Sequence, residues 1–144
     1  MNWNRIAKIG ALSVGATALS AGAAFADDVK VTLTGVKAGG EVLVALQTKD
    51  EFLMPKGSYG AKAPAVAGTM TLTIKDVKPG AYSLTVLQDQ DGDKMMKMGS
   101  DGRPQEGWAM KNAAQLKGGP TWDAVSFEVA RAPVSITEPM HYPN

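Results

Sequence analysis

The sequence predicts an all-β protein, an antiparallel β-sandwich that carries a long acidic loop. Three observations lead to this fold class. Several segments alternate apolar and polar residues with a period of two, which is typical of strands with one buried face. Turn signals rich in Gly and Pro separate these segments, and no segment has the spacing of a long amphipathic helix.

Residues 1–26 are predicted to be a signal peptide that is removed on export. Arg5 and Lys8 give the segment a positive start, a run of apolar and small residues follows, and the tripeptide that ends at Ala26 has the small-x-small pattern of a cleavage site. An uncleaved membrane anchor is the weaker alternative, because hydroxyl residues interrupt the apolar run. We therefore expect a single sandwich domain over residues 27–144, located in the periplasm or secreted.

The composition excludes several classes of protein. Lys and Arg total 15 and Asp and Glu total 14, for a net charge of +1, and no basic run is present, so the footprint of a nucleic-acid binder is missing. The chain has no cysteine, so burial alone must hold the fold in an oxidising compartment. We expect an unknown periplasmic protein or a small ligand as partner, no nucleic acid, and no membrane once the signal peptide is removed.

The first strands follow directly after the signal peptide. Residues 29–33 alternate apolar with polar side chains, and residues 42–46 are apolar on both faces, which places the second segment centrally in a sheet. Residues 50–68 are irregular and long for a loop, so a helical turn or an edge strand is expected within them. We expect Phe52 and Leu53 to pack back onto the core.

Residues 69–75 form the clearest amphipathic strand of the chain. The sequence Lys78-Pro79-Gly80 then predicts a type II turn, in which Gly takes the positive φ. The strand over residues 81–87 follows, with its apolar side chains facing inward: Tyr82, Leu84 and Val86. Because the connection is so short, the two strands are predicted to form an antiparallel hairpin.

The last third of the chain carries weaker signals. Residues 106–117 predict a short helix around Trp108, limited by the glycines at both ends. Residues 125–129 alternate as a strand, and a final strand begins at Val134. Pro139 removes a backbone donor from that last strand, which indicates a sheet edge or a bulge.

An acidic loop follows the strand that ends near Leu87. Asp89, Asp91 and Asp93 stand at every second position, the carboxylate spacing that opens a calcium-binding loop. Alternate side chains of a curled segment can converge on one hard cation, which prefers six to eight oxygen ligands. Asp101 and Glu106 are the candidates for the remaining carboxylates.

Two positions of the acidic loop depart from an EF-hand. Lys94 stands where the sharp turn needs Gly, and Ser100 stands where a bidentate Glu belongs. The alternative is a solvated loop in which aspartates such as Asp89 accept hydrogen bonds from nearby backbone. Both interpretations remain open at this point.

A second candidate surface lies in the same loop. Met95, Met96 and Met98 form a thioether cluster, and thioethers are soft ligands that select Cu(I). Methionines also serve as adaptable contact surfaces for partner proteins. Trp108 extends this ligand surface, and it either stacks with a ligand or covers the end of the sandwich, which we consider the better interpretation.

Catalytic chemistry has little support in the sequence. The chain has no cysteine and one histidine, His141, which we expect at the surface, so nucleophile–base pairs are scarce. Asp89 with Glu106 is the one carboxylate pair that fits a hydrolase. The leading prediction is a non-enzymatic binding or accessory module that uses the loop from Asp89 to Trp108 as its working surface, with metal binding and carboxylate-based hydrolysis as alternatives.

Four segments resemble one exported bacterial family, domain of unknown function 2141. They are Pro79-Gly80-Ala81-Tyr82, the acidic run Gln88–Asp93, Gly102–Trp108, and Gly118–Phe127. The chain departs from the pattern at Gln88, Lys94 and Lys97, where the family has His, Gly and Asp. The resemblance implies an immunoglobulin- or transthyretin-like sandwich, also found in carboxypeptidase regulatory domains, and it implies no established activity.

Overall fold

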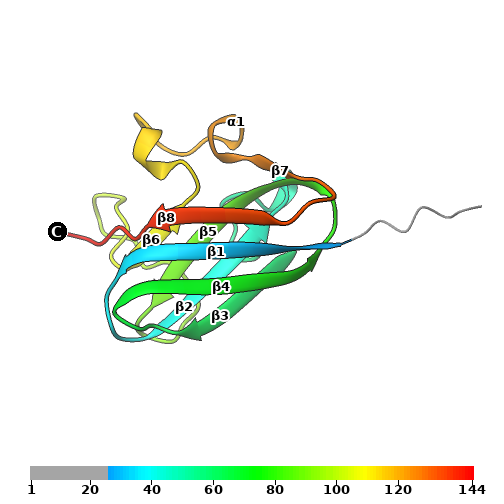
Figure 1. Ribbon diagram of the computed structural model, residues 1–144. Coiled ribbons are helices and arrows are strands. Elements are labelled where there is room, and N and C mark those ends of the chain that lie inside the picture. Colours follow the sequence, from blue (N-terminus) through cyan, green and yellow to red (C-terminus); the bar gives the residue numbers. More distant parts are fainter. Residues whose placement is uncertain (1–25) are drawn as a thin grey trace, which may run out of the picture.

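Two packed β-sheets form the body of the protein in a computed structural model that describes residues 26–144 (Figure 1). The predicted signal peptide lies outside the described residues, apart from Ala26. The strands are β1 (Asp27–Val36), β2 (Glu41–Gln47), β3 (Tyr59–Pro64), β4 (Gly68–Val77), β5 (Gly80–Asp89), β6 (Gly107–Met110), β7 (Phe127–Val129) and β8 (Val134–Pro139). Three single-turn helices complete the fold: η1 (Lys49–Glu51), η2 (Ala113–Gln115) and α1 (Trp122–Val125).

The strand order defines a β-sandwich, as predicted. One sheet has the order β4-β1-β8 and the other the order β3-β2-β5-β6, with β7 pairing with the start of β5. The pairings are antiparallel except that β8 runs parallel to β1, so the first and last strands are neighbours. In Figure 1 the three-stranded sheet lies in front of the other sheet.

The core contains the apolar residues that the alternation identified. Fully or almost fully buried are Val29, Val31, Leu33, Val42, Val44, Leu46, Leu72, Ile74, Tyr82, Leu84 and Val86. The central position predicted for residues 42–46 is confirmed, because β2 lies between β3 and β5. Every strand that the structure describes, and with these strands the described core, lies within residues 27–144.

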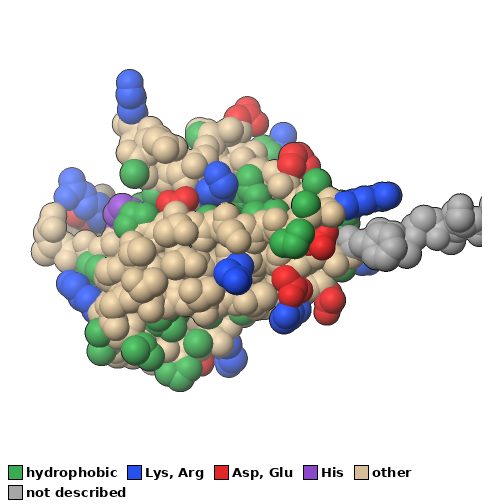
Figure 2. Space-filling model, viewed as in Figure 1, with side chains coloured by type: hydrophobic (Ala, Val, Ile, Leu, Met, Phe, Trp, Pro, Cys, Tyr) green, Lys and Arg blue, Asp and Glu red, His purple; other side chains and the backbone are tan. Residues whose placement is uncertain are grey.

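Polar residues occupy the outward positions of the three-stranded sheet. Thr32 of β1 lies between Thr71 of β4 and Thr137 of β8, and the hydroxyl oxygens of Thr32 and Thr71 are 3.3 Å apart. Figure 2 shows this face as a broad area of backbone and of side chains that are neither hydrophobic nor charged, with few charged groups. The period-two pattern therefore predicts the outer face as well as the core.

The predicted hairpin over residues 69–87 is wrong. β4 pairs with β1 in one sheet and β5 pairs with β2 in the other, so the connection between them crosses from sheet to sheet. The positive φ predicted for Gly80 is found instead at Asp76, with φ 55°. Each of these strands has an apolar face, and crossing over lets both faces meet in one core, whereas a hairpin would keep them side by side in one sheet.

The helix predicted over residues 106–117 is also wrong. β6 occupies its first part, with Ala109 facing inward and Trp108 outward, and only the single turn η2 is helical. Pairing with β5 satisfies the backbone of this segment, and that long-range pairing overrides the local helical pattern. Val125, expected in a strand, ends the short helix α1 instead.

The irregular region over residues 50–68 holds both predicted features. The helical turn η1 begins it, and β3 forms the edge of the five-stranded sheet. Phe52 packs edge-to-face on Trp122 with ring centroids 5.7 Å apart. Leu53 does not pack onto the core as expected: its side chain is 57% exposed. No helix in residues 26–144 is long and apolar enough to cross a membrane.

Candidate functional site

The acidic loop connects β5 to β6, and buried carboxylates stand at both of its ends. Asp89 is the last residue of β5, Glu106 directly precedes β6, and each residue is only 4% exposed. Because charged side chains are costly to bury, each must have compensating partners. The solvated-loop interpretation is therefore wrong about the exposure of Asp89, although the backbone hydrogen bonds that it predicted for Asp89 are present.

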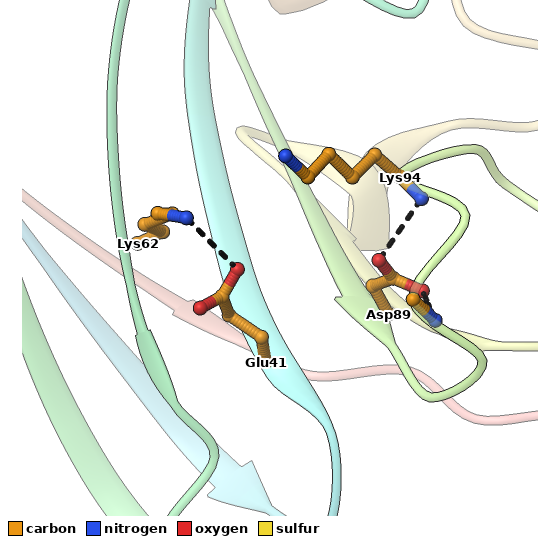
Figure 3. Close-up of polar contacts among 5 residues, drawn as sticks. Glu41, Lys62, Asp89 and Lys94 are labelled. Atoms are coloured by element: carbon orange, nitrogen blue, oxygen red, sulfur yellow. Dashed lines mark hydrogen bonds and ion pairs between the residues drawn. The ribbon is translucent and has the colours of Figure 1, made fainter.

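Backbone N–H groups of the loop compensate both carboxylates. Asp89 accepts from the N–H of Gly92 through Oδ1 (2.8 Å) and from the N–H of Lys94 through Oδ2 (3.0 Å). Figure 3 shows that the backbone nitrogen of Lys94 faces Asp89 while the lysine side chain extends away from it. Lys94 adopts a left-handed conformation with φ 61°, so the lysine in place of Gly still makes the turn.

Glu106 closes the loop from its other end. Its Oε1 accepts from the N–H of Gln90 and its Oε2 from the N–H of Lys97, both at 3.1 Å. All four oxygens of the two buried carboxylates thus accept backbone hydrogen bonds. These hydrogen bonds hold the loop in one conformation from its buried side. Hydrogen bonds to ionised groups are stronger than hydrogen bonds between neutral groups.

The remaining aspartates of the loop lie at its surface. Asp91 accepts from the N–H of Asp93 (3.1 Å), and Asp93 accepts from the N–H of Met95 (2.8 Å). Asp101 accepts from the N–H of Arg103 (3.1 Å) in the same way. These are the local backbone hydrogen bonds that the loop interpretation predicted for aspartates.

Three of the five predicted metal-binding carboxylates converge. One oxygen each of Asp89, Asp91 and Glu106 lie within 4.8 Å of one another, a spacing that suits a shared hard cation. Asp93 and Asp101 are not part of this group. The calcium site stays a prediction, with three carboxylates as its ligand set.

A shallow depression lies beside the group formed by Asp89, Asp91 and Glu106. Its lining residues are Gly40, Glu41, Asp89, Gln90, Asp91, Gly92 and Lys94. Glu41 forms an ion pair with Lys62 of the edge strand β3 at 3.6 Å, also drawn in Figure 3. Gly40 is required here, because a Cβ atom on it would lie 2.1 Å from the carbonyl oxygen of Asp89.

The methionine cluster lies on the far part of the loop. Met95 is 55% exposed and Met98 is 54% exposed, whereas Met96 is half-buried. Short backbone hydrogen bonds hold the arm that carries Met98, from Gln105 N–H to the carbonyl of Lys97 (2.7 Å) and from Gly99 N–H to that of Arg103 (2.8 Å). The exposed thioethers therefore stand on an ordered segment of chain.

Trp108 lies at the foot of the loop with His141. Their rings stack with centroids 4.7 Å apart, and their backbones exchange two hydrogen bonds, of 2.8 and 2.7 Å. His141 was expected at the surface, but it is half-buried in this contact. Trp108 also lines a small hollow together with Arg103, Gln105 and Tyr142.

Gln88, which the sequence identified only as a departure from the His of the family pattern, is a structural residue of the site. It is fully buried, donates to the carbonyls of Lys37 (2.8 Å) and Gly39 (2.6 Å), and accepts from the hydroxyl of Tyr142 (2.6 Å). Its burial could have been predicted from its position, because every second residue of a strand faces the same way and Gln88 continues the inward series of Leu84 and Val86 along β5.

Comparison with known proteins supports one assignment. Searches among curated proteins and among solved structures gave no significant match. A family model described as an uncharacterized protein conserved in bacteria matches residues 31–137, which include the whole acidic loop and all strands except the start of β1 and the end of β8. This range covers more than half of the chain and confirms the predicted resemblance, and the chain therefore belongs to the DUF2141 family of bacterial proteins.

Proposed function

We propose that this protein is an exported, non-enzymatic binding or accessory module whose working surface is the loop from Asp89 to Trp108. The observation that carries the proposal is the way the loop is built. Asp89 and Glu106 fix it from inside through four backbone hydrogen bonds, while Met95 and Met98 are more than half exposed. A pre-ordered surface binds with a smaller loss of conformational entropy.

The exposed thioethers favour a protein as the partner, because methionine side chains adapt to irregular apolar surfaces. The small hollow at Trp108 favours a small ligand as the alternative. A carboxylate-based hydrolase is less well supported. Asp89 and Glu106 are buried, and each of their oxygens accepts a backbone N–H, which leaves them poorly placed to exchange protons with a substrate.

The binding proposal is tested by photo-cross-linking in the exporting bacterium. We expect a benzoylphenylalanine placed at residue 98 to yield a discrete adduct with a protein partner. The same probe at residue 66 is the matched control, since Val66 is 61% exposed outside the loop. The adduct should disappear when Met95→Ser removes the neighbouring thioether. No adduct from residue 98, or equal adducts from both positions, would contradict a protein partner on this loop.

Calcium binding is the second candidate function, favoured by the convergence of Asp89, Asp91 and Glu106 within 4.8 Å. If the group holds calcium, the metal should raise the melting temperature and EDTA should reverse the rise, because a ligand that binds only the native state stabilises it. Asp91→Asn should abolish that rise with little effect on the metal-free protein, since Asp91 is exposed. Asp101→Asn is the control and should keep the calcium response.

The same melts test copper. Cu(I) should raise the melting temperature of the wild type, but not of a variant with Met95→Ser and Met98→Ser, if the thioethers bind it. Unchanged melting temperatures with both metals would remove both metal functions and leave the binding module.

A further inference from the structure

A second surface stands at the other end of the sandwich, in the loop after β2. Leu53 is 57% exposed and Met54 is 49% exposed, and we call these two residues the apolar tip. They are neighbours in the chain and are followed by Pro55. Single exposed apolar residues need no explanation, but a pair held outward by the rest of its loop does.

Buried Gln47 holds the backbone on both sides of the apolar tip. Its Nε2 donates to the carbonyls of Met54 (2.6 Å) and Lys56 (2.8 Å), and its Oε1 accepts from the N–H of Leu53 (3.3 Å). The residue is only 2% exposed, so these are interior hydrogen bonds made to a surface loop. Buried polar groups of this kind fix one conformation, because leaving them unpaired is costly.

Leu53 is held in an unfavourable conformation. Its φ is 63°, in the left-handed region that non-glycine residues seldom adopt. Such a residue costs about 1–3 kcal/mol and persists only where the surroundings determine it. Gly or Asn would relieve this strain, yet the position carries a leucine whose side chain points to solvent.

Glu51 supports the same loop from its other side. Its carboxylate accepts from the N–H and hydroxyl of Thr48 (3.0 and 3.1 Å) and from the hydroxyl of Ser58 (2.9 Å). The backbone hydrogen bond from Thr48, followed by the hydroxyl of Ser58, lowers the pKa of Glu51 below its ordinary value, so the side chain stays ionised at neutral pH. Phe52 is fixed by its contact with Trp122.

The apolar tip lies at the end of the sandwich where the described chain begins. Gln47 pairs with Ser83 at the start of β5, and Asp27 pairs with Val77, whose strand leads directly into β5. In Figure 1, β1 starts at the end of the sandwich opposite to the C-terminus. The described chain therefore begins at the end of the sandwich that carries the tip.

The surroundings of the tip decide between possible partners. A stable contact with another protein buries about 1,200–2,000 Å² in total, but the residues beside the tip are exposed and mostly polar: Lys49, Asp50, Lys56 and Gly57. A small exposed apolar pair with a lysine on each side in the chain, Lys49 and Lys56, suits a lipid surface instead. The apolar side chains enter the acyl boundary while the lysines stay among the headgroups.

We propose that Leu53 and Met54 form a membrane-docking tip that inserts into the surface of a phospholipid bilayer and orients the domain with its acidic loop facing away. This departs from the sequence expectation of no membrane partner once the signal peptide is removed. The contact is peripheral and needs no spanning segment. It is independent of the function proposed for the acidic loop.

Vesicle co-sedimentation tests the docking tip. The exported form, from Asp27 onward, is mixed with vesicles of phosphatidylethanolamine and phosphatidylglycerol. We expect the wild type to sediment with the vesicles, and the double variant Leu53→Ser, Met54→Ser to lose about tenfold in apparent affinity or more, because most of the inserted apolar area is removed. Both side chains are exposed, so the variant should melt as the wild type does.

Two controls make the result specific. Val66→Ser removes an equally exposed apolar side chain at the opposite end of the sandwich and should leave vesicle binding unchanged. The variant with Met95→Ser and Met98→Ser should also bind vesicles normally, which separates this test from that of the acidic loop. Failure of the wild type to bind vesicles, or equal losses in the Val66 and tip variants, would overturn the proposal.

Discussion

Leu84→Asp is expected to prevent folding altogether. Leu84 is fully buried in the middle of β5, where it lies opposite Leu46 of β2. An unpaired charge at this position costs several kcal/mol, against a total stability of about 5–15 kcal/mol for a domain. The chain has no cysteine and thus no disulfide to offset the loss. Far-UV circular dichroism and a thermal melt should show no cooperative transition.

Thr85→Asp is the matched control for this variant. Thr85 is the next residue of β5, and its side chain faces outward. The control should fold and melt cooperatively, because the new carboxylate stays in contact with water. If Leu84→Asp melts close to the wild type, the inward face of β5 has been assigned wrongly.

Glu106→Leu is expected to destabilise the protein by about 2–4 kcal/mol and to disorder the acidic loop. The substitution leaves the N–H groups of Gln90 and Lys97 without their acceptor, and each unsatisfied buried donor costs about 1–3 kcal/mol. The midpoint of urea denaturation should fall accordingly. Amide hydrogen exchange should accelerate at Gln90 and Lys97 while the core of β5 stays protected until global unfolding.

Asp93→Asn provides the comparison for Glu106→Leu. Asp93 belongs to the same loop and also accepts a backbone hydrogen bond, but it is exposed, and an asparagine keeps a side-chain acceptor. Its stability should stay within about 0.5 kcal/mol of the wild type. A Glu106→Leu protein that matches this control would show that the loop does not depend on its buried carboxylate.

The alternation of apolar and polar residues with a period of two was sufficient to identify the core residues of the strands. Residues with inward parity, such as Val31 and Ile74, are buried as the alternation predicted. The alternation does not show which strands pair with each other. A short connection such as Lys78-Pro79 fits a hairpin or a crossing between sheets, and only the need to cover two apolar faces decides between them.

In the acidic loop, too, the local features could be predicted from the sequence and the long-range contacts could not. The spacing of Asp89, Asp91 and Asp93 correctly marked a carboxylate-rich loop, and the backbone hydrogen bonds of Asp91 and Asp93 are local and followed from residue type. The pairing of Glu106 with Gln90 spans 16 positions, and it exists only because β5 and β6 are adjacent in the sheet. Sequence spacing carries no information on such a contact.

The parallel pairing of β8 with β1 has a consequence for the order of assembly. β1 is the first described strand and lies between β4 and β8, so one of its two neighbours is the last described strand. The tail beyond β8 then joins the two sheets, since Met140 donates to the carbonyl of Thr34 and His141 to that of Trp108. Without β8 the three-stranded sheet lacks one edge, and without residues 140 and 141 the two sheets lack this link. The sandwich therefore closes only when the two ends of the described chain have met, and contacts between residues so far apart in sequence form slowly during folding.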